Sequence, residues 1–227
     1  MKIGILITGH LPDEMKPDYG TYAPMFETLL DGQGFTFQSW SVVDMQFPTD
    51  VDQADGWLIT GSRHGAYEEH AFIPPLEEFI RAAYAADVPM VGVCFGHQII
   101  AQALGGKVIK YPEGWAVGRQ EYEYDGKKVY LNAWHQDQVV TRPDDATVLA
   151  GNDFCENAVL LYGEKAFTIQ PHPEFKGTFV NGLLTHRANG IVPPDLIKTA
   201  QDHLDDPIDD NAVAQSITRF FKTRQVK

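Results

Sequence analysis

The feature that most constrains the fold is the alternation of short apolar runs with helical patterns over residues 2–106. Short apolar runs that end at glycine or at turn residues are typical of strands buried in a parallel sheet. They predict strands at residues 2–8, 35–42, 56–60 and 89–93. Apolar residues at helical spacing predict helices at residues 22–30, 74–86 and 95–104. This βαβ succession indicates an α/β fold, a single doubly wound and largely parallel sheet flanked by helices.

The pattern changes over residues 108–170, where short strand-like segments alternate with turns. Strands are predicted at residues 120–124, 128–131, 147–150 and 166–170, with a turn at Asp125 and Gly126. We therefore expect an added antiparallel region in the second half, followed by helices at residues 194–203 and 211–222. No repeat or flexible linker divides the sequence, so residues 1–227 are expected to form one domain, with residues 175–227 as a helical C-terminal extension.

Composition excludes several classes of function. The 227-residue chain has a net charge of −13 and no basic run, which argues against nucleic-acid binding. No apolar stretch approaches the ~20 residues that span a bilayer, and the first apolar run is too short for a secretion signal. Two cysteines, Cys94 and Cys155, are too few for a disulfide framework. We expect a cytoplasmic protein that binds neither nucleic acid nor membrane.

Cys94 lies where the predicted strand at residues 89–93 meets the following helix. A nucleophile at such a corner projects from the sheet, and Gly92 and Gly96 allow neighbouring backbone to approach closely. The helix directs its N-terminal amides toward the thiol, which favours the thiolate, and the Phe95 amide could bind the oxyanion of an attacked carbonyl. Free cysteines are often simply buried. The corner alone therefore leaves a structural and a catalytic interpretation open.

The sequence His-Pro-Glu at residues 172–174 follows the strand predicted at residues 166–170. A thiolate nucleophile commonly works with a histidine that accepts and returns protons, and a third group orients that histidine. Residues two apart in an extended segment face the same side, so Glu174 can hold the His172 ring nitrogen that faces away from the cysteine. Alone, such a pair is more often a surface ion pair. Together with Cys94, it indicates a catalytic triad.

With these motifs the chain resembles the class I glutamine amidotransferases and their free-standing relatives. The resemblance rests on Gly-Val-Cys-Phe-Gly-His-Gln at residues 92–98, His-Pro-Glu at 172–174, Thr-Gly-Ser at 60–62 and Trp-His-Gln-Asp at 134–137. These elements have the order and separation of that family. The resemblance implies that Cys94, His172 and Glu174 cleave the amide of glutamine, or of another γ-glutamyl compound, through a γ-glutamyl thioester.

The resemblance also assigns residues around the triad. It implies an oxyanion hole formed by the backbone near Gly61 and Phe95, and substrate contacts from Gln98, His135, Gln136 and Asp137. Asp137 could pair with a substrate α-amino group, whereas His97 is expected to be a packed core histidine. Neither histidine-containing segment, 135–137 or 172–174, has the spacing of common metal sites, so no metal is expected.

The sequence leaves three functions open. It contains neither a phosphate-binding loop nor a dinucleotide fingerprint, so this chain is not expected to activate an ammonia acceptor or to need a cofactor. The chain could be a glutaminase that serves a separate synthetase subunit, or a self-sufficient hydrolase of γ-glutamyl peptides or amines. A binding or regulatory protein is the third possibility.

Two residues beside the expected site depart from the family pattern. Pro171 and Trp134 lie next to that site, where a changed pocket wall could admit a γ-glutamyl substituent larger than ammonia. The segment at residues 63–67 could contribute to the same wall, or it could be a solvated loop. The identity of the leaving group therefore depends on these positions.

Overall fold

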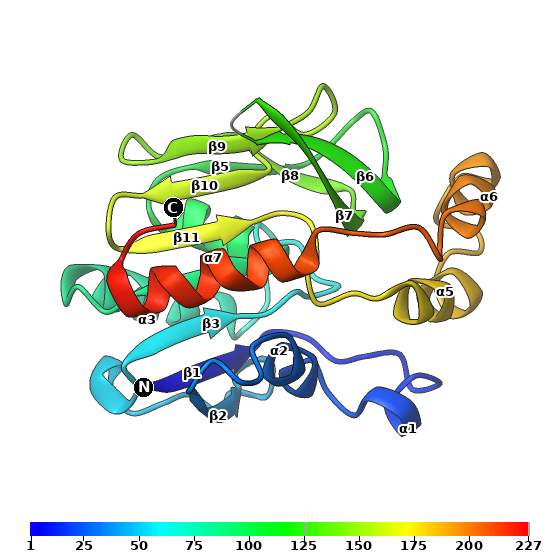
Figure 1. Cartoon of the computed structure of the whole chain (residues 1–227). Coiled ribbons are helices and arrows are strands. Elements are labelled where there is room, and N and C mark those ends of the chain that lie inside the picture. The colour runs from blue at the N-terminus through cyan, green and yellow to red at the C-terminus, as the bar shows by residue number, and fades with distance from the viewer. Residues whose placement is uncertain (125, 227) are drawn as a thin grey trace.

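Strands from both halves of the chain form one mixed sheet (Figure 1). The computed structural model describes residues 1–124 and 126–226, so Asp125 of the predicted turn lies outside the described residues. Five parallel strands lie in the order β2 (Thr36–Ser41), β1 (Lys2–Ile7), β3 (Gly56–Ile59), β4 (Met90–Val93) and β11 (Ala166–Ile169). The sheet continues antiparallel through β10 (Val159–Tyr162), β9 (Thr147–Gly151), β6 (Ala116–Tyr124) and β7 (Lys127–His135). The predicted fold class is confirmed.

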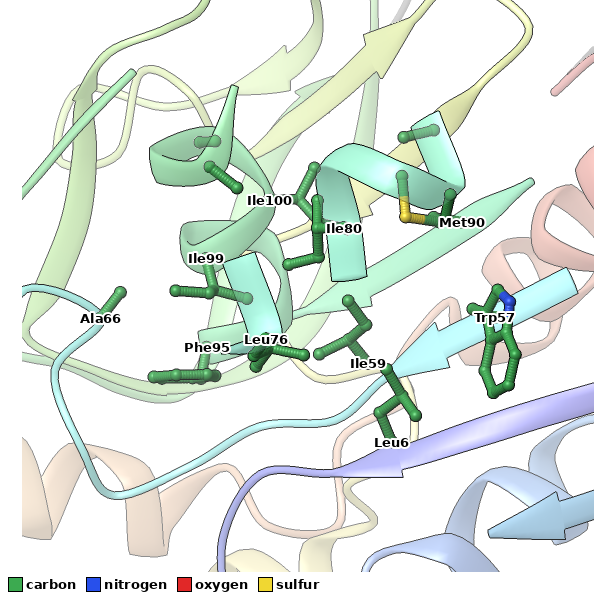
Figure 2. Packing of buried hydrophobic residues seen from close by; sticks show 14 of the residues in the cluster. Leu6, Trp57, Ile59, Ala66, Leu76, Ile80, Met90, Phe95, Ile99 and Ile100 are labelled. Atoms are coloured by element: carbon green, nitrogen blue, oxygen red, sulfur yellow. The ribbon is translucent and has the colours of Figure 1, made fainter. Parts of the chain in front are cut away.

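Helices cover both faces of the parallel half. On one face lie α3 (Ile73–Ala85) and α4 (Phe95–Ala103), and on the other lie α2 (Ala23–Leu29) and α7 (Asp210–Thr223). Prolines in the first turn of α3 suit a helix start, because the amides there have no intrahelical acceptor. Figure 2 shows the first layer, where Leu6 and Ile59 of the sheet meet Leu76 and Ile80 of α3 and Ile99 and Ile100 of α4. These layers fix where β4 ends and α4 begins.

Three further helices lie near the carboxyl ends of the parallel strands (Figure 1). These are α1 (Lys16–Tyr19), α5 (Gly177–His186) and α6 (Pro194–Asp202). Their apolar residues form a cluster of their own, in which Leu183 of α5 packs with Leu11, Met15 and Phe175. This cluster closes one side of the region in which the predicted catalytic residues lie.

Smaller elements complete the structure. β5 (Lys107–Lys110) pairs antiparallel with β8 (Asp137–Thr141) in a separate two-stranded sheet. Single 3-10 turns occur at Val42–Asp44 and Val51–Gln53. Among the described helices, none combines the length and the apolar character needed to cross a bilayer. The helix α1 and the strands β5, β8 and β10 were not predicted from the sequence, and α5 lies in the expected helical extension at 175–227 without a predicted range of its own.

Candidate active site

Cys94 is the single residue between β4 and α4, and its backbone is strained. Its φ of +54° and ψ of −105° lie in a region that residues with a side chain rarely adopt. The Cys94 amide donates to the carbonyl of Ile169 at 2.8 Å, and the Gly96 amide donates to the carbonyl of Thr60 at 3.1 Å. Two neighbouring strand ends therefore hold the corner, and Cys94 is only 5% exposed.

Gly92 and Gly96 allow the close packing that the corner requires. A Cβ on Gly92 would overlap the backbone carbonyl of Gly96, and a Cβ on Gly96 would overlap the carbonyl of Ile59. Backbone atoms cannot rotate away as a flexible side chain can. Any larger residue at either position would push α4 off the sheet and move Cys94 with it.

His172 follows β11 and is held from three directions. Its Nδ1 lies 2.7 Å from Glu174 Oε1, and both side chains are buried. Its backbone amide donates to the carbonyl of Asn132 at 2.8 Å. Its ring stacks on Phe175, with ring centroids 3.7 Å apart and planes within 4° of parallel. The Asn132 amide group in turn donates to the carbonyl of Phe175 at 2.9 Å, so strand β7 supports the whole turn.

The charges around His172 favour its protonated form. Burial alone lowers the pKa of His172, but Glu174 and Cys94 act in the opposite sense and raise the pKa well above its usual value. β11 pairs in parallel with β4, with Ile169 opposite Val93, so the two strands end side by side. A Cβ built on Gly61 would lie 2.9 Å from His172 Cε1 and 3.6 Å from Cys94 Cβ. The strand ends of β3, β4 and β11 thus converge on one point.

The two residues predicted for the oxyanion hole flank this point. Gly61 follows β3 in a turn where its carbonyl accepts from the Thr8 hydroxyl at 3.0 Å. The Ser62 hydroxyl donates to the carbonyl of Thr8 at 2.8 Å, which fixes the same turn. Phe95 is the first residue of α4, where a backbone amide has no intrahelical acceptor. The backbone at both positions is therefore fixed beside Cys94.

Two cavities meet at Cys94. The larger, of about 190 Å³, is lined by all four predicted substrate-contact residues: Gln98, His135, Gln136 and Asp137. The smaller, of about 50 Å³, lies on the side of His172 and is lined by Tyr22 and Phe175. Ser62, Arg63, Cys94, Trp134 and Arg187 line both.

Three of the predicted substrate-contact residues also hold the cavity wall together. Gln98 donates from Nε2 to the carbonyl of Asp137 at 2.9 Å and to Gln170 Oε1 at 3.0 Å. Gln136 donates to the carbonyl of Tyr111 at 3.2 Å. Asp137 begins strand β8, and its Oδ1 accepts from the Tyr67 hydroxyl at 3.0 Å. The first of these bonds ties α4 to β8, and the others join the cavity wall to Gln170, Tyr111 and Tyr67.

Burial also shifts the pKa values of two side chains in the cavity wall, His135 and Asp137. It lowers the pKa of His135 to about 3, and the charge on His172 adds to the effect, so His135 is neutral. Burial raises the pKa of Asp137; Tyr67 opposes this shift, while Glu68 adds to it. His97 is fully buried beneath the site, with Nδ1 2.8 Å from Thr168 Oγ1, which agrees with its prediction as a core histidine.

The sequence did not single out several residues of this site. Asn132 and Phe175 hold His172, and Arg187 follows α5 and reaches both cavities. Phe175 adjoins the His-Pro-Glu motif, so its position offered a signal. The other two reach the site only through tertiary packing. Four residues of the segment at 63–67 line the larger cavity, as one of the two interpretations of that segment expects.

Comparisons with known proteins identify the family of the chain. The model of the glutamine amidotransferase class-I family matches residues 38–184. Gamma-glutamyl peptidase 4 of Arabidopsis thaliana is 29% identical over 92% of this chain and 90% of its own. One component of the glutamine-hydrolyzing GMP synthase of Methanopyrus kandleri is 34% identical over 58% of this chain and 73% of its own.

A solved structure supports the fold over the whole chain. A glutamine amidotransferase from Thermotoga maritima has a TM-score of 0.75 and 19% identity, covering 100% of this chain and 98% of that one. The residues that the family model matches include the corner cysteine, the turn at Gly61 and the His-Pro-Glu motif. The chain belongs to the class I glutamine amidotransferase family.

Proposed function

We propose that this chain hydrolyses the side-chain amide of a γ-glutamyl compound through a thioester on Cys94. The observation that carries the proposal is the position of Cys94, strained at a strand–helix corner next to the buried His172–Glu174 pair. Strained backbone of this kind persists only where surrounding structure enforces it, and it is frequent at active sites. The names of the related hydrolases and amidotransferases support amide hydrolysis.

In the first half of the proposed reaction, the Cys94 thiolate attacks the γ-carbonyl carbon. The oxyanion that forms accepts hydrogen bonds from the backbone amides of Gly61 and Phe95. Protonated His172, stabilised by Glu174, then donates its proton to the leaving nitrogen. The C–N bond breaks, the amine or ammonia departs, and the γ-glutamyl group remains on sulfur as a thioester.

In the second half, His172 accepts a proton from water while the water oxygen attacks the thioester carbon. The C–S bond breaks, glutamate leaves, and the thiolate and the protonated imidazole are restored. Glu174 keeps its hydrogen bond to Nδ1 throughout, which leaves Nε2 as the nitrogen that exchanges protons. In this proposal the glutamyl group occupies the 190 Å³ cavity, with Gln98, His135, Gln136 and Asp137 around it.

One observation favours the self-sufficient γ-glutamyl peptidase over a glutaminase that serves a synthetase. Arg63 and Arg187 line the cavity on the His172 side, where the leaving group would depart. In the described part of the chain, neither guanidinium is engaged in an ion pair or hydrogen bond. Glutamine releases ammonia, which offers an arginine nothing to bind. A γ-glutamyl peptide releases an amino acid or peptide whose carboxylate could pair with Arg187.

The test compares three substrates: glutamine, γ-glutamylglycine and γ-glutamylethylamide. The last two release amines of similar size, and only glycine carries a carboxylate. We expect the purified chain to prefer γ-glutamylglycine and Cys94→Ala to abolish hydrolysis of all three. Hydrolysis by Cys94→Ala at the wild-type rate would refute the thioester mechanism.

Arginine variants test the leaving-group assignment. Arg187→Gln should lower kcat/KM for γ-glutamylglycine by about 10- to 100-fold, the value of a charged hydrogen bond of roughly 1.5–3 kcal/mol, and should change the ethylamide reaction far less. Arg219→Gln, on the exposed surface of α7, is the matched control. Equal losses on both substrates would contradict recognition of a carboxylate. Ammonia release that rises strongly on addition of a synthetase would instead support a glutaminase of a two-chain enzyme.

A further inference from the structure

Three side chains that could bind a metal lie together between β3 and α3. They are His64, Glu68 and His70, and one ligand atom from each lies within 4.8 Å of the other two. His70 Nε2 is 2.7 Å from Glu68 Oε2, and His64 Nδ1 is 3.9 Å from the same oxygen. The two imidazole ring centroids are 4.1 Å apart. All three side chains therefore face a common point.

These distances are close to those of a tetrahedral metal site. Zinc binds imidazole nitrogen and carboxylate oxygen at about 2.0–2.2 Å, which places neighbouring ligand atoms about 3.4 Å apart. The atoms here lie on both sides of that spacing, so small side-chain rotations would bring them into position. Two imidazoles and one carboxylate form a donor set that suits zinc and related divalent transition metals.

The local structure holds the ligands in place. Both imidazole rings contact Phe72, with centroids 5.8 Å from His64 and 5.9 Å from His70. The His64 amide donates to the Ser62 hydroxyl at 3.2 Å, and the Glu68 amide donates to the carbonyl of Gly65 at 3.0 Å. Ligands oriented in advance by packing and backbone bonds lose less entropy when a metal binds.

We propose that His64, Glu68 and His70 form a binding site for a divalent transition metal, with Zn²⁺ as the ion that best fits the donor set. His64 and Glu68 also line the larger cavity beside Cys94. A bound ion would therefore lie in the wall of that cavity and would fix the segment that carries Tyr67, the partner of Asp137. Metal binding here does not depend on the proposed hydrolysis.

The test measures Zn²⁺ binding to the full chain by isothermal titration calorimetry in a Cys94→Ala background. That background removes the Cys94 thiol, a strong zinc ligand in the wall of the same cavity. We expect one equivalent to bind, and we expect the additional change His70→Gln to weaken binding at least tenfold. His203→Gln is the matched control, because His203 and Asp206 form an exposed pair at 2.7 Å that belongs to no group of three ligand atoms within 4.8 Å of one another in the described chain.

Two further measurements keep the result unambiguous. Circular dichroism verifies that each variant is folded, and Glu68→Gln provides a second ligand variant that should also weaken binding. Bound Co²⁺ should give the visible absorption typical of a four-coordinate site. Equal Zn²⁺ affinity with and without His70→Gln and Glu68→Gln, or no binding to the Cys94→Ala protein, would overturn the proposal.

Discussion

Gly61→Ala is the substitution that most directly tests how the strand ends converge. Its backbone lies outside the left-handed region, so alanine introduces no conformational penalty of that kind. The new methyl group would lie 2.9 Å from His172 Cε1 and 3.6 Å from Cys94 Cβ. Carbon atoms in contact normally lie about 3.5–4.0 Å apart, so the His172 ring must move by about 0.6 Å or more.

The surroundings of His172 determine what that movement costs. The ring is stacked on Phe175 and bonded to Glu174, so a displacement strains at least one of these contacts. Overpacking of a buried site costs about 1–3 kcal/mol of folding free energy. A misplacement of about 1 Å at a catalytic group lowers the rate by about 100-fold. We therefore expect kcat/KM to fall between about tenfold and 100-fold in a protein that still folds.

The assay is the initial rate of γ-glutamylglycine hydrolysis, with circular dichroism as the check on folding. Gly182→Ala in α5 is the control, because its Cβ would lie 2.7 Å from the flexible end of Met15 rather than from a catalytic group. The control should retain kcat/KM within about threefold of wild type. A Gly61→Ala protein with equally unchanged kcat/KM would refute the placement of His172 and Cys94 around Gly61.

Three other predictions follow from the same site. Glu174→Gln removes a charge that raises the pKa of His172, so the alkaline limb of the pH profile of kcat/KM should move to lower pH. The rate should also fall about 10²- to 10⁴-fold. An alkaline limb at the wild-type pH would contradict this prediction. Asn132→Ala leaves a buried carbonyl without its donor and should lower the free energy of unfolding by about 1–3 kcal/mol, measured in urea; an unchanged midpoint would argue against that bond. Burial raises the pKa of Cys155 to about 12, so iodoacetamide at neutral pH should label only Cys94 of the two cysteines. Two labels on the chain by mass spectrometry would contradict this prediction.

The parallel half of the fold could be predicted because its strands are continuous apolar runs. Strands predicted at residues 2–8 and 56–60 occur at Lys2–Ile7 and Gly56–Ile59, and the helix predicted at 95–104 occurs at Phe95–Ala103. A strand that is buried on both faces of a sheet needs apolar residues at successive positions, which produces a continuous apolar run. The positions of Cys94 and His172 follow from where those runs end.

The parts that could not be predicted depend on tertiary contacts. The apolar pattern of α5 is interrupted by Asn181 and Gly182, and its position is set by Leu183 packing in the cluster with Leu11. Arg187 reaches the cavities only because that helix docks there. Strand β8 pairs with β5, which is distant in the chain, and the sequence of neither strand strongly indicates the pairing. Substrate roles for the residues that line the larger cavity stay predictions.

The parallel pairing of β4 with β11 also has a consequence for the order of folding. Strand β4, which precedes Cys94, is made early, whereas β11, which precedes His172, follows the whole antiparallel region in the chain. On the ribosome Cys94 therefore emerges long before His172, and the two residues can lie side by side only after β11 has inserted between β4 and β10. Distant pairings of this kind form late, because loop closure must precede them. Recovery of activity on refolding should report completion of the central sheet.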